Sequence, residues 1–239
     1  MAALTGQTVV VIGGSAGIGL EVARLARSEG ADVVLTARDA THLAVAAAEV
    51  GARTSVAFDA TDFTALEEFF RDLQTPVDHV MVTAGRPYYA PLAQIDFEQA
   101  RRSLEAHLLL PFHLARCAGP SMRAGGSLLL MGGTGARRPG VGLGIIGIGT
   151  TALPGVVANL ALEIAPVRVN LIAAGFVDTP LSASLLGDGL DERRDELRST
   201  LPIGRVVSPV DVARLAVHLM TNTALTGATY DIDGGQQLV

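Results

Sequence analysis

The chain has 239 residues, of which 49% are apolar and 18% charged, and this excludes a disordered chain, because disorder goes with low hydrophobicity and high net charge. The net charge of −6 argues against a protein that binds nucleic acid or an anionic membrane surface, since both partners require a basic face. The single cysteine, Cys117, excludes an internal disulfide framework and a multi-thiolate metal site, and it is typical of a reducing compartment, so we expect a cytoplasmic protein.

Short β-branched runs alternate with longer segments of helical period, a pattern typical of an α/β protein built from βαβ units. In chain order, the sequence predicts strands at 8–12, 33–36, 54–58, 79–83, 127–131, 167–172 and 229–232. Helices are predicted after the glycine turn 13–19 and at 41–50, 63–73, 96–117, 151–164 and 209–220, with Pro111 as a kink or break in the longest. No segment carries about 18 uninterrupted apolar residues, so we expect no membrane-spanning helix.

The sequence shows neither a linker nor an internal repeat, so residues 1–239 are expected to form a single domain. Its expected fold is a doubly wound parallel sheet of about seven strands with helices on both faces. One segment departs from the alternating pattern, because glycines are dense from Gly132 to Gly149. Ordering glycine costs backbone entropy and gains few side-chain contacts, so this segment is expected to be a mobile loop.

The first predicted strand runs directly into the glycine-rich turn Gly13–Gly19, and a helix follows. Glycines let the backbone turn tightly and approach a ligand, while free N–H groups and the helix dipole attract an anion. This placement in a βαβ series favours a site for the pyrophosphate of a dinucleotide over a glycine turn without a ligand.

Several motifs, taken in order, resemble the short-chain dehydrogenase/reductase family. They are the spacing G-x-x-x-G-x-G at Gly13–Gly19, Asp59-Ala60 after the third strand, Thr83-Ala84-Gly85 after the fourth, Ala174–Thr179 after the sixth, and the ending Tyr230–Gly235. The resemblance covers essentially the whole chain. It implies a single-domain Rossmann-type sheet and hydride transfer with a nicotinamide dinucleotide.

The resemblance also implies a set of cofactor-binding residues. The pyrophosphate would lie against Gly13, Ser15, Gly17, Ile18 and Gly19. Asp59 would accept from the adenine amino group beside the Ala60 backbone, Ala84 and Gly85 would line the adenine-ribose side, and Thr179 would hold the carboxamide or a phosphate oxygen. Three positions depart from the family pattern and weaken local support: Ile12, Thr83 and Ala174 stand where threonine, asparagine and proline are usual.

The end of the second strand bears on the choice between NAD(H) and NADP(H). An NAD site places a carboxylate there for the ribose hydroxyls, but this chain has Ala37 followed by Arg38. A guanidinium suits a 2′-phosphate, although Asp39 offsets part of its charge and a solvated surface arginine is the alternative. We therefore expect NADP(H) to be preferred over NAD(H).

The residues that move protons in the family are replaced in this chain. The resemblance places its serine, tyrosine and lysine at Gly133, Ile146 and Thr150, and its asparagine at His107. A shifted alignment does not restore them, because all 18 basic residues are arginine. Without a lysine no cation can depress a neighbouring pKa from that position. General acid–base help is typically worth about 10² to 10⁴ in rate, so standard carbonyl reduction is expected to be weak or absent.

Two residues are candidates for a substitute proton donor. Tyr88 follows the fourth strand near its carboxyl end, and His107 titrates near neutrality, although packing roles are the plain alternatives for both. Arg137 and Arg138 could clamp a carboxylate or phosphate, or else be solvated. The other histidines show no metal-ligand spacing, so no metal is predicted.

Two functions remain open. The first is an NADP(H)-dependent oxidoreductase acting on an unknown small molecule through a non-standard donor; the second is a catalytically inactive dinucleotide-binding sensor or assembly partner. A fold without cofactor is disfavoured, because Arg38 and Asp59 would then have no role. The helix 151–164 is apolar on more than one face, so with the family habit we expect a homo-oligomer, a tetramer or dimer.

Overall fold

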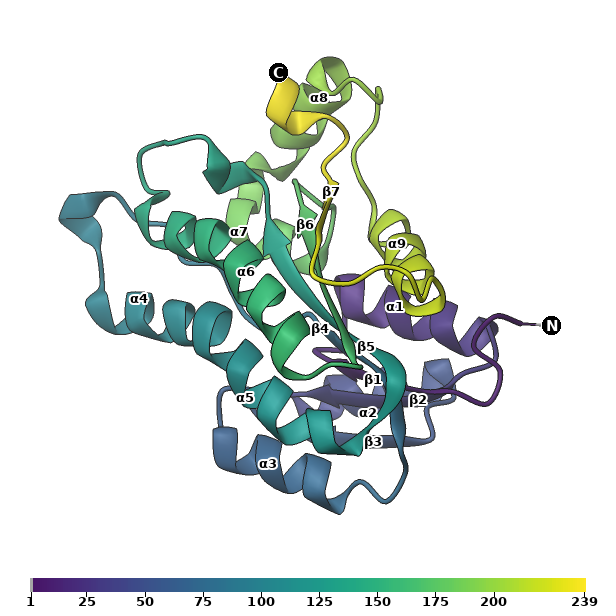
Figure 1. Cartoon of the computed structure of the whole chain (residues 1–239). Coiled ribbons are helices and arrows are strands. Elements are labelled where there is room, and N and C mark those ends of the chain that lie inside the picture. Colours follow the sequence, from purple (N-terminus) through teal and green to yellow (C-terminus); the bar gives the residue numbers. More distant parts are fainter. Residues whose placement is uncertain (1) are drawn as a thin grey trace.

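The strands of residues 2–239, the part of the chain that the computed structural model describes, form one parallel sheet of seven strands (Figure 1). They are β1 (Thr8–Ile12), β2 (Asp32–Ala37), β3 (Thr54–Ala57), β4 (Val77–Val82), β5 (Met122–Gly133), β6 (Arg168–Ala174) and β7 (Thr229–Ile232). Their order is β3-β2-β1-β4-β5-β6-β7, so the winding reverses between β1 and β4. In doubly wound sheets ligands bind at the carboxyl ends of the strands, beside this reversal.

Helices cover both faces of the sheet. One face packs against α1 (Gly17–Ser28), α2 (Ala40–Val50) and α9 (Pro209–Thr221). The other packs against α3 (Phe63–Asp72), α5 (Leu110–Ala118) and α6 (Gly144–Glu163). The remaining helices are α4 (Phe97–Leu104), which leads into α5, and α7 (Pro180–Leu186) and α8 (Leu190–Thr200), which follow β6.

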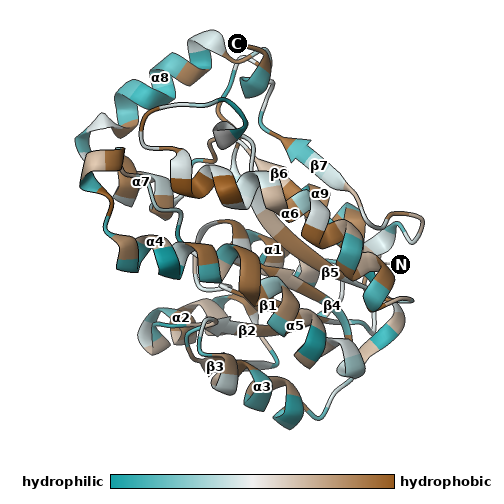
Figure 2. Cartoon of the chain, turned by 60° about the vertical axis from the view of Figure 1, so that its left-hand side comes forward, coloured by the Kyte–Doolittle hydropathy of each residue, from teal (hydrophilic) through white to brown (hydrophobic). Residues whose placement is uncertain are grey.

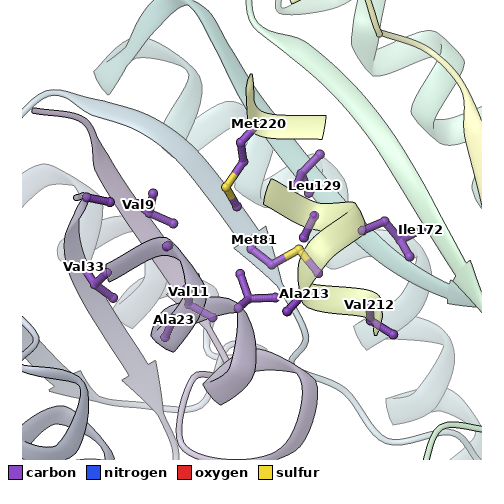
Figure 3. Packing of buried hydrophobic residues seen from close by; sticks show 14 of the residues in the cluster. Val9, Val11, Ala23, Val33, Met81, Leu129, Ile172, Val212, Ala213 and Met220 are labelled. Atoms are coloured by element: carbon purple, nitrogen blue, oxygen red, sulfur yellow. The ribbon is translucent and has the colours of Figure 1, made fainter. Parts of the chain in front are cut away.

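Two hydrophobic cores form because side chains alternate along each strand. In β1, Val9 and Val11 belong to one core, whereas Val10 and Ile12 belong to the other. Figure 3 shows the first core, in which strand side chains meet α1 at Ala23 and α9 at Val212, Ala213 and Met220. Figure 2 shows the apolar residues concentrated on the strands, whereas α8 is mostly polar.

The predicted doubly wound α/β fold is confirmed, and β1 and β7 begin and end at the predicted residues. The predicted helix 96–117 is divided in two. A π-helical segment, Glu105–Leu109, joins α4 to α5. Pro111 explains the change, because it has no N–H for the carbonyl of His107, and its ring would clash with that oxygen in an α-helix.

The prediction of a mobile loop from Gly132 to Gly149 is wrong at both ends. β5 extends through Gly133, and α6 begins at Gly144, seven residues before its predicted start at Thr151. The glycines serve close packing here: a Cβ on Gly149 would lie 3.3 Å from the Cβ of His107. The absence of a side chain at Gly149 lets α6 pack closely against the π-helical segment. The sequence argument considered only the backbone entropy of glycine and did not predict this packing.

The α6 helix has the length and apolar composition of a membrane span. In its most apolar 18-residue stretch, 28% of the residues are buried in the fold. Leu153, Val157 and Leu160 of α6 are core residues packed against the sheet. The outer face retains exposed apolar side chains, including Ile148 (47% exposed) and Leu162 (79% exposed).

Candidate active site

A cavity of about 1240 Å³ opens at the carboxyl ends of β1, β4, β5 and β6. The segments that follow these strands line it, together with the π-helical segment, α6 and α7. The cavity brings together most of the residues singled out in the sequence: Gly13, Gly17, Ile18, Gly19, Tyr88, Ala84, Gly85, His107, Gly133, Ile146, Thr150 and Thr179. Ser15, Arg38, Asp59 and Ala60 are not part of its lining.

The turn between β1 and α1 is built so tightly that only glycine fits. A Cβ on Gly19 would lie 2.2 Å from the carbonyl oxygen of Gly13, and a Cβ on Gly13 would lie 2.7 Å from the amide nitrogen of Ala84. Gly17 begins α1 at a φ of +54°, and a Cβ there would touch Thr179 at 3.5 Å. The turn therefore faces the start of α7 across the cavity.

The N-terminus of α1 is open to an anion. Ala16 precedes the helix and gives no side-chain cap, and the first turn carries no acidic residue. The first N–H groups of a helix lack partners within it, and together with the helix dipole they attract negative charge. The glycine turn is therefore followed by a helix N-terminus with no side-chain cap and no acidic residue in its first turn.

Thr83 supports this turn despite its departure from the family pattern. Its hydroxyl donates a hydrogen bond to the carbonyl of Gly13 at 3.0 Å. The expected weakening is therefore offset, since the threonine supplies the side-chain donor that ties β4 to the glycine turn.

Arg38 and Asp59, the residues predicted for the adenosine end, follow β2 and β3. The Arg38 guanidinium is 75% exposed and lies 4.0 Å from the Asp59 carboxylate. The backbone N–H and hydroxyl of Thr61 both donate to Asp59, at 2.9 and 2.7 Å. Burial raises the pKa of the Asp59 carboxyl, but the bonds from Thr61 and the charge of Arg38 outweigh it and leave that pKa lowered.

Asp39 competes less for Arg38 than the sequence suggested. Its carboxylate accepts the backbone N–H of His42 at 2.8 Å and caps the N-terminus of α2. This hydrogen bond is the main cause of a lowered pKa for Asp39. The carboxylate thus has a structural partner of its own, and Arg38 remains exposed for a ligand.

Gly133, Ile146 and Thr150 meet on one wall of the cavity. The hydroxyl of Thr150 donates to the carbonyl of Ile146 at 3.0 Å, a bond within α6, and the residue is 6% exposed. Thr134, next to Gly133, is outside the lining, and its buried hydroxyl has no hydrogen-bond partner among the described residues. This wall therefore offers neither an acidic proton nor a cation.

His107 lies in the π-helical segment next to α6, where Gly149 packs against it, and it also lines the cavity. Its Nδ1 lies 2.7 Å from the carbonyl oxygen of Ser103. Because a carbonyl only accepts, Nδ1 carries the proton, and Nε2 of the neutral ring is an acceptor. His107 can donate from Nε2 only when the ring is protonated.

Tyr88 keeps a proton to donate. Its oxygen accepts the backbone N–H of Asp96 at 2.7 Å, which leaves the phenolic O–H available. Tyr88 and His107 both line the cavity, so the structure brings the two candidate donors into one site.

The sequence left open whether Arg137 and Arg138 clamp an anion or are solvated, and the structure pairs both with the C-terminal segment. Arg137 makes a two-pronged ion pair with Asp231 at 2.7 and 2.8 Å. Arg138 donates to the carbonyls of Gln237 and Val239. Both arginines hold the C-terminal segment against the loop after β5, a pairing between distant segments that no local pattern in the sequence indicated.

The same C-terminal segment brings an unforeseen residue to the cavity. Gln236 lines it, and its side-chain oxygen accepts the backbone N–H of Phe176 at 2.8 Å. Sequence reasoning also missed Arg86, which lines the cavity directly after Gly85. The one signal in the sequence that could have identified Arg86 is its position directly after the motif Thr83-Ala84-Gly85.

Comparisons with known proteins extend over essentially the whole chain. A family model described as enoyl-(acyl carrier protein) reductase matches residues 12–237. Carbonyl reductase family member 4 of Xenopus tropicalis is 31% identical, over 97% of this chain and 98% of that protein. The structure of the MalC reductase/Diels-Alderase of Malbranchea aurantiaca is similar with a TM-score of 0.91 at 26% identity, covering 100% and 99% of the two chains. BdcA in complex with NADPH is similar with a TM-score of 0.87 at 30% identity, covering 98% and 95%.

Proposed function

The chain belongs to the short-chain dehydrogenase/reductase family, and from this premise we propose that it is an oxidoreductase that binds NADP(H) in preference to NAD(H) and uses a non-standard proton donor. The observation that carries the proposal is the contrast within one cavity. Its phosphate cradle at Gly13–Gly19 has the close-packed form and open helix N-terminus that a dinucleotide needs. The same cavity has Ile146 and Thr150 at the positions where the family has an acid and its activating cation.

The cofactor would lie with its pyrophosphate on the backbone N–H groups of Gly17–Gly19 and its 2′-phosphate at Arg38. Asp59 would accept from the adenine amino group, and Thr179 would hold the carboxamide or a phosphate oxygen. Support for NADP(H) comes from the exposed Arg38, from the absence of a carboxylate at Ala37, and from the NADPH complex of the relative BdcA. A bound nicotinamide supplies hydride transfer to an electrophilic carbon.

Tyr88 is the donor that the hydrogen bonds favour, because its O–H is available in the neutral side chain. His107 donates from Nε2 only as an imidazolium, because Nδ1 holds the proton of the neutral ring. The chain contains no lysine, so neither residue has the lysine that activates the family's proton donor. Substrates that need less proton assistance than a ketone, such as an activated C=C or C=N bond, fit this site best.

The test measures NADPH oxidation by the purified protein over a panel of ketones, enones and imines. We expect activity on enones or imines that exceeds activity on ketones. The variants Tyr88→Phe and His107→Ala then distinguish the two candidate donors. Tyr230→Phe and His42→Ala are the matched controls outside the cavity lining. If both cavity variants keep the wild-type rate, neither residue is the donor.

A titration of the protein with NADPH, together with this activity assay, decides between the proposed oxidoreductase and the second function. Tight NADPH binding without turnover on any substrate would favour a catalytically inactive dinucleotide-binding sensor or assembly partner. We further propose that the exposed apolar face of α6 is covered in a homo-oligomer, a dimer or tetramer, and that the protein works in the cytoplasm. No nucleic acid or membrane partner is proposed.

A further inference from the structure

Arg86 lies between the two sides of the cavity. Its backbone carbonyl accepts from the hydroxyl of Ser103 on α4 at 3.5 Å. Its guanidinium reaches α7, where it donates to the hydroxyl of Ser184 at 3.4 Å. The side chain therefore extends from the His107 side of the cavity toward α7, held at its far end by one long hydrogen bond to an uncharged acceptor.

The charge of Arg86 is not balanced within the cavity. Across residues 2–239, no aspartate or glutamate belongs to the cavity lining, and its charged members are Arg86 and Arg193. Arg193 is paired with Glu196 at 2.5 Å. Arg86 has no carboxylate within 4.0 Å in the described part of the chain, and a guanidinium stays protonated at all physiological pH values. Arg86 thus gives this end of the cavity a permanent positive charge.

This charge lies next to an apolar wall. Leu181, Leu185 and Leu186 of α7 all line the cavity, and they are 40%, 37% and 39% exposed. Such leucines bind the hydrocarbon part of a ligand, and a guanidinium binds a carboxylate through two parallel hydrogen bonds. An apolar acid satisfies both features at once.

The cofactor phosphates do not account for Arg86. The open N-terminus of α1 faces Thr179 just before α7, whereas Ser184, the partner of Arg86, lies more than one turn farther along α7. One turn of helix is about 5 Å, so Ser184 is separated along α7 from Thr179, the residue that the N-terminus of α1 faces. The guanidinium is consequently placed for a group on the substrate.

We propose that Arg86 determines substrate specificity by binding the carboxylate of an apolar acid whose hydrocarbon part packs on the leucines of α7. The inference rests on the proposed function, because it places that substrate in the same cavity as NADP(H). When the ligand carboxylate binds, it replaces the weak hydrogen bond between Arg86 and Ser184. The ligand, and not Ser184, then holds the Arg86 guanidinium in position.

The test compares matched acids and amides: hexanoate with hexanamide, and cinnamate with cinnamamide. Calorimetric titration into the full-length protein, with and without saturating NADPH, gives Kd for each. At least one acid should bind the wild type tenfold or more tightly than its amide, since a charge-assisted pair is about twice as strong as a neutral hydrogen bond. Arg86→Gln should abolish this preference and leave the Kd for the amide and for NADPH unchanged.

Two control variants make the outcome specific. Ser184→Ala removes the contact on α7 without removing the charge, and it should retain the preference for acids. Arg214→Gln removes an arginine outside the cavity and should do the same. Equal Kd values for acid and amide, failure of every acid to bind, or a preserved preference in Arg86→Gln would each overturn the proposal. Loss of NADPH binding alone would refute the proposed function instead, because the acid preference is also measured without NADPH.

Discussion

Arg38 gives the sharpest test of cofactor choice. The substitution Arg38→Ser removes the guanidinium from the end of β2 and leaves the phosphate cradle at Gly13–Gly19 intact. Arg38 is 75% exposed and only 4.0 Å from Asp59, so its removal disturbs no core contact. The effect should therefore fall on the 2′-phosphate, the group that distinguishes NADPH from NADH.

The size of the effect follows from this exposure. Hydrogen bonds to charged groups are worth about 1.5–3 kcal/mol. Because Arg38 is solvated and shares its charge with Asp59, we take the lower end, and about 1.4 kcal/mol is a tenfold change in Kd. Arg38→Ser should thus weaken NADPH binding by roughly tenfold and leave NADH binding unchanged.

Nicotinamide fluorescence during titration with NADPH and with NADH measures both constants. Arg71→Ser is the matched control, since Arg71 is 63% exposed and pairs with Asp72 at the far end of α3. Raising the salt concentration should weaken NADPH binding by the wild type more than by Arg38→Ser, because exposed charges are screened. Equal wild-type affinities for the two cofactors, or an unchanged ratio in Arg38→Ser, would refute this reasoning.

Three further predictions concern the cradle, stability and assembly. Gly19→Ala should reduce NADPH affinity by more than about tenfold in a titration, because its Cβ would lie 2.2 Å from the Gly13 carbonyl, whereas Gly189→Ala has open space and should bind normally. His79 is buried between Ser127 and Gln7, and burial first, then Arg168, lowers its pKa to about 4. Between pH 6.5 and pH 4, His79 is protonated in the unfolded chain but stays neutral in the folded chain. The free energy of unfolding should therefore fall by up to about 3 kcal/mol as the pH is lowered from 6.5 to 4. Urea titrations should show this contribution missing in His79→Gln, and an identical pH dependence in both proteins would contradict it. Leu162→Glu on α6 should convert the proposed homo-oligomer to a smaller species by light scattering, whereas Val45→Glu on α2 should not; a monomeric wild type would disprove the interface.

The strands and most helices were predictable from sequence because their periodicity and their stop signals agree. Gly51, for example, ends α2 in the left-handed conformation expected of a glycine after a helix. The start of α6 was not predictable, because glycine has low helix propensity and only the contact of Gly149 with His107 explains its presence. Tertiary packing outweighed local preference at this helix.

The candidate site shows the same division. The tight turn at Gly13–Gly19 was predictable because its glycines, strand and helix are consecutive, and a local motif encodes them. The partners of Arg137 and Arg86 were not, because Asp231 and Ser184 lie about a hundred residues away along the chain. The tautomer of His107 likewise depends on the Ser103 carbonyl, which only the helix geometry places beside it.

The most direct measurement introduces the family's serine, tyrosine and lysine at the positions where the resemblance places them. Ile146 and Thr150 lie one helical turn apart on α6, and with Gly133 they line the same cavity. The combined variant Gly133→Ser, Ile146→Tyr and Thr150→Lys should raise kcat/KM for ketone reduction with NADPH by at least about 100-fold. A folded variant that binds NADPH and shows no gain, or a wild type that already reduces ketones as fast, would contradict the account.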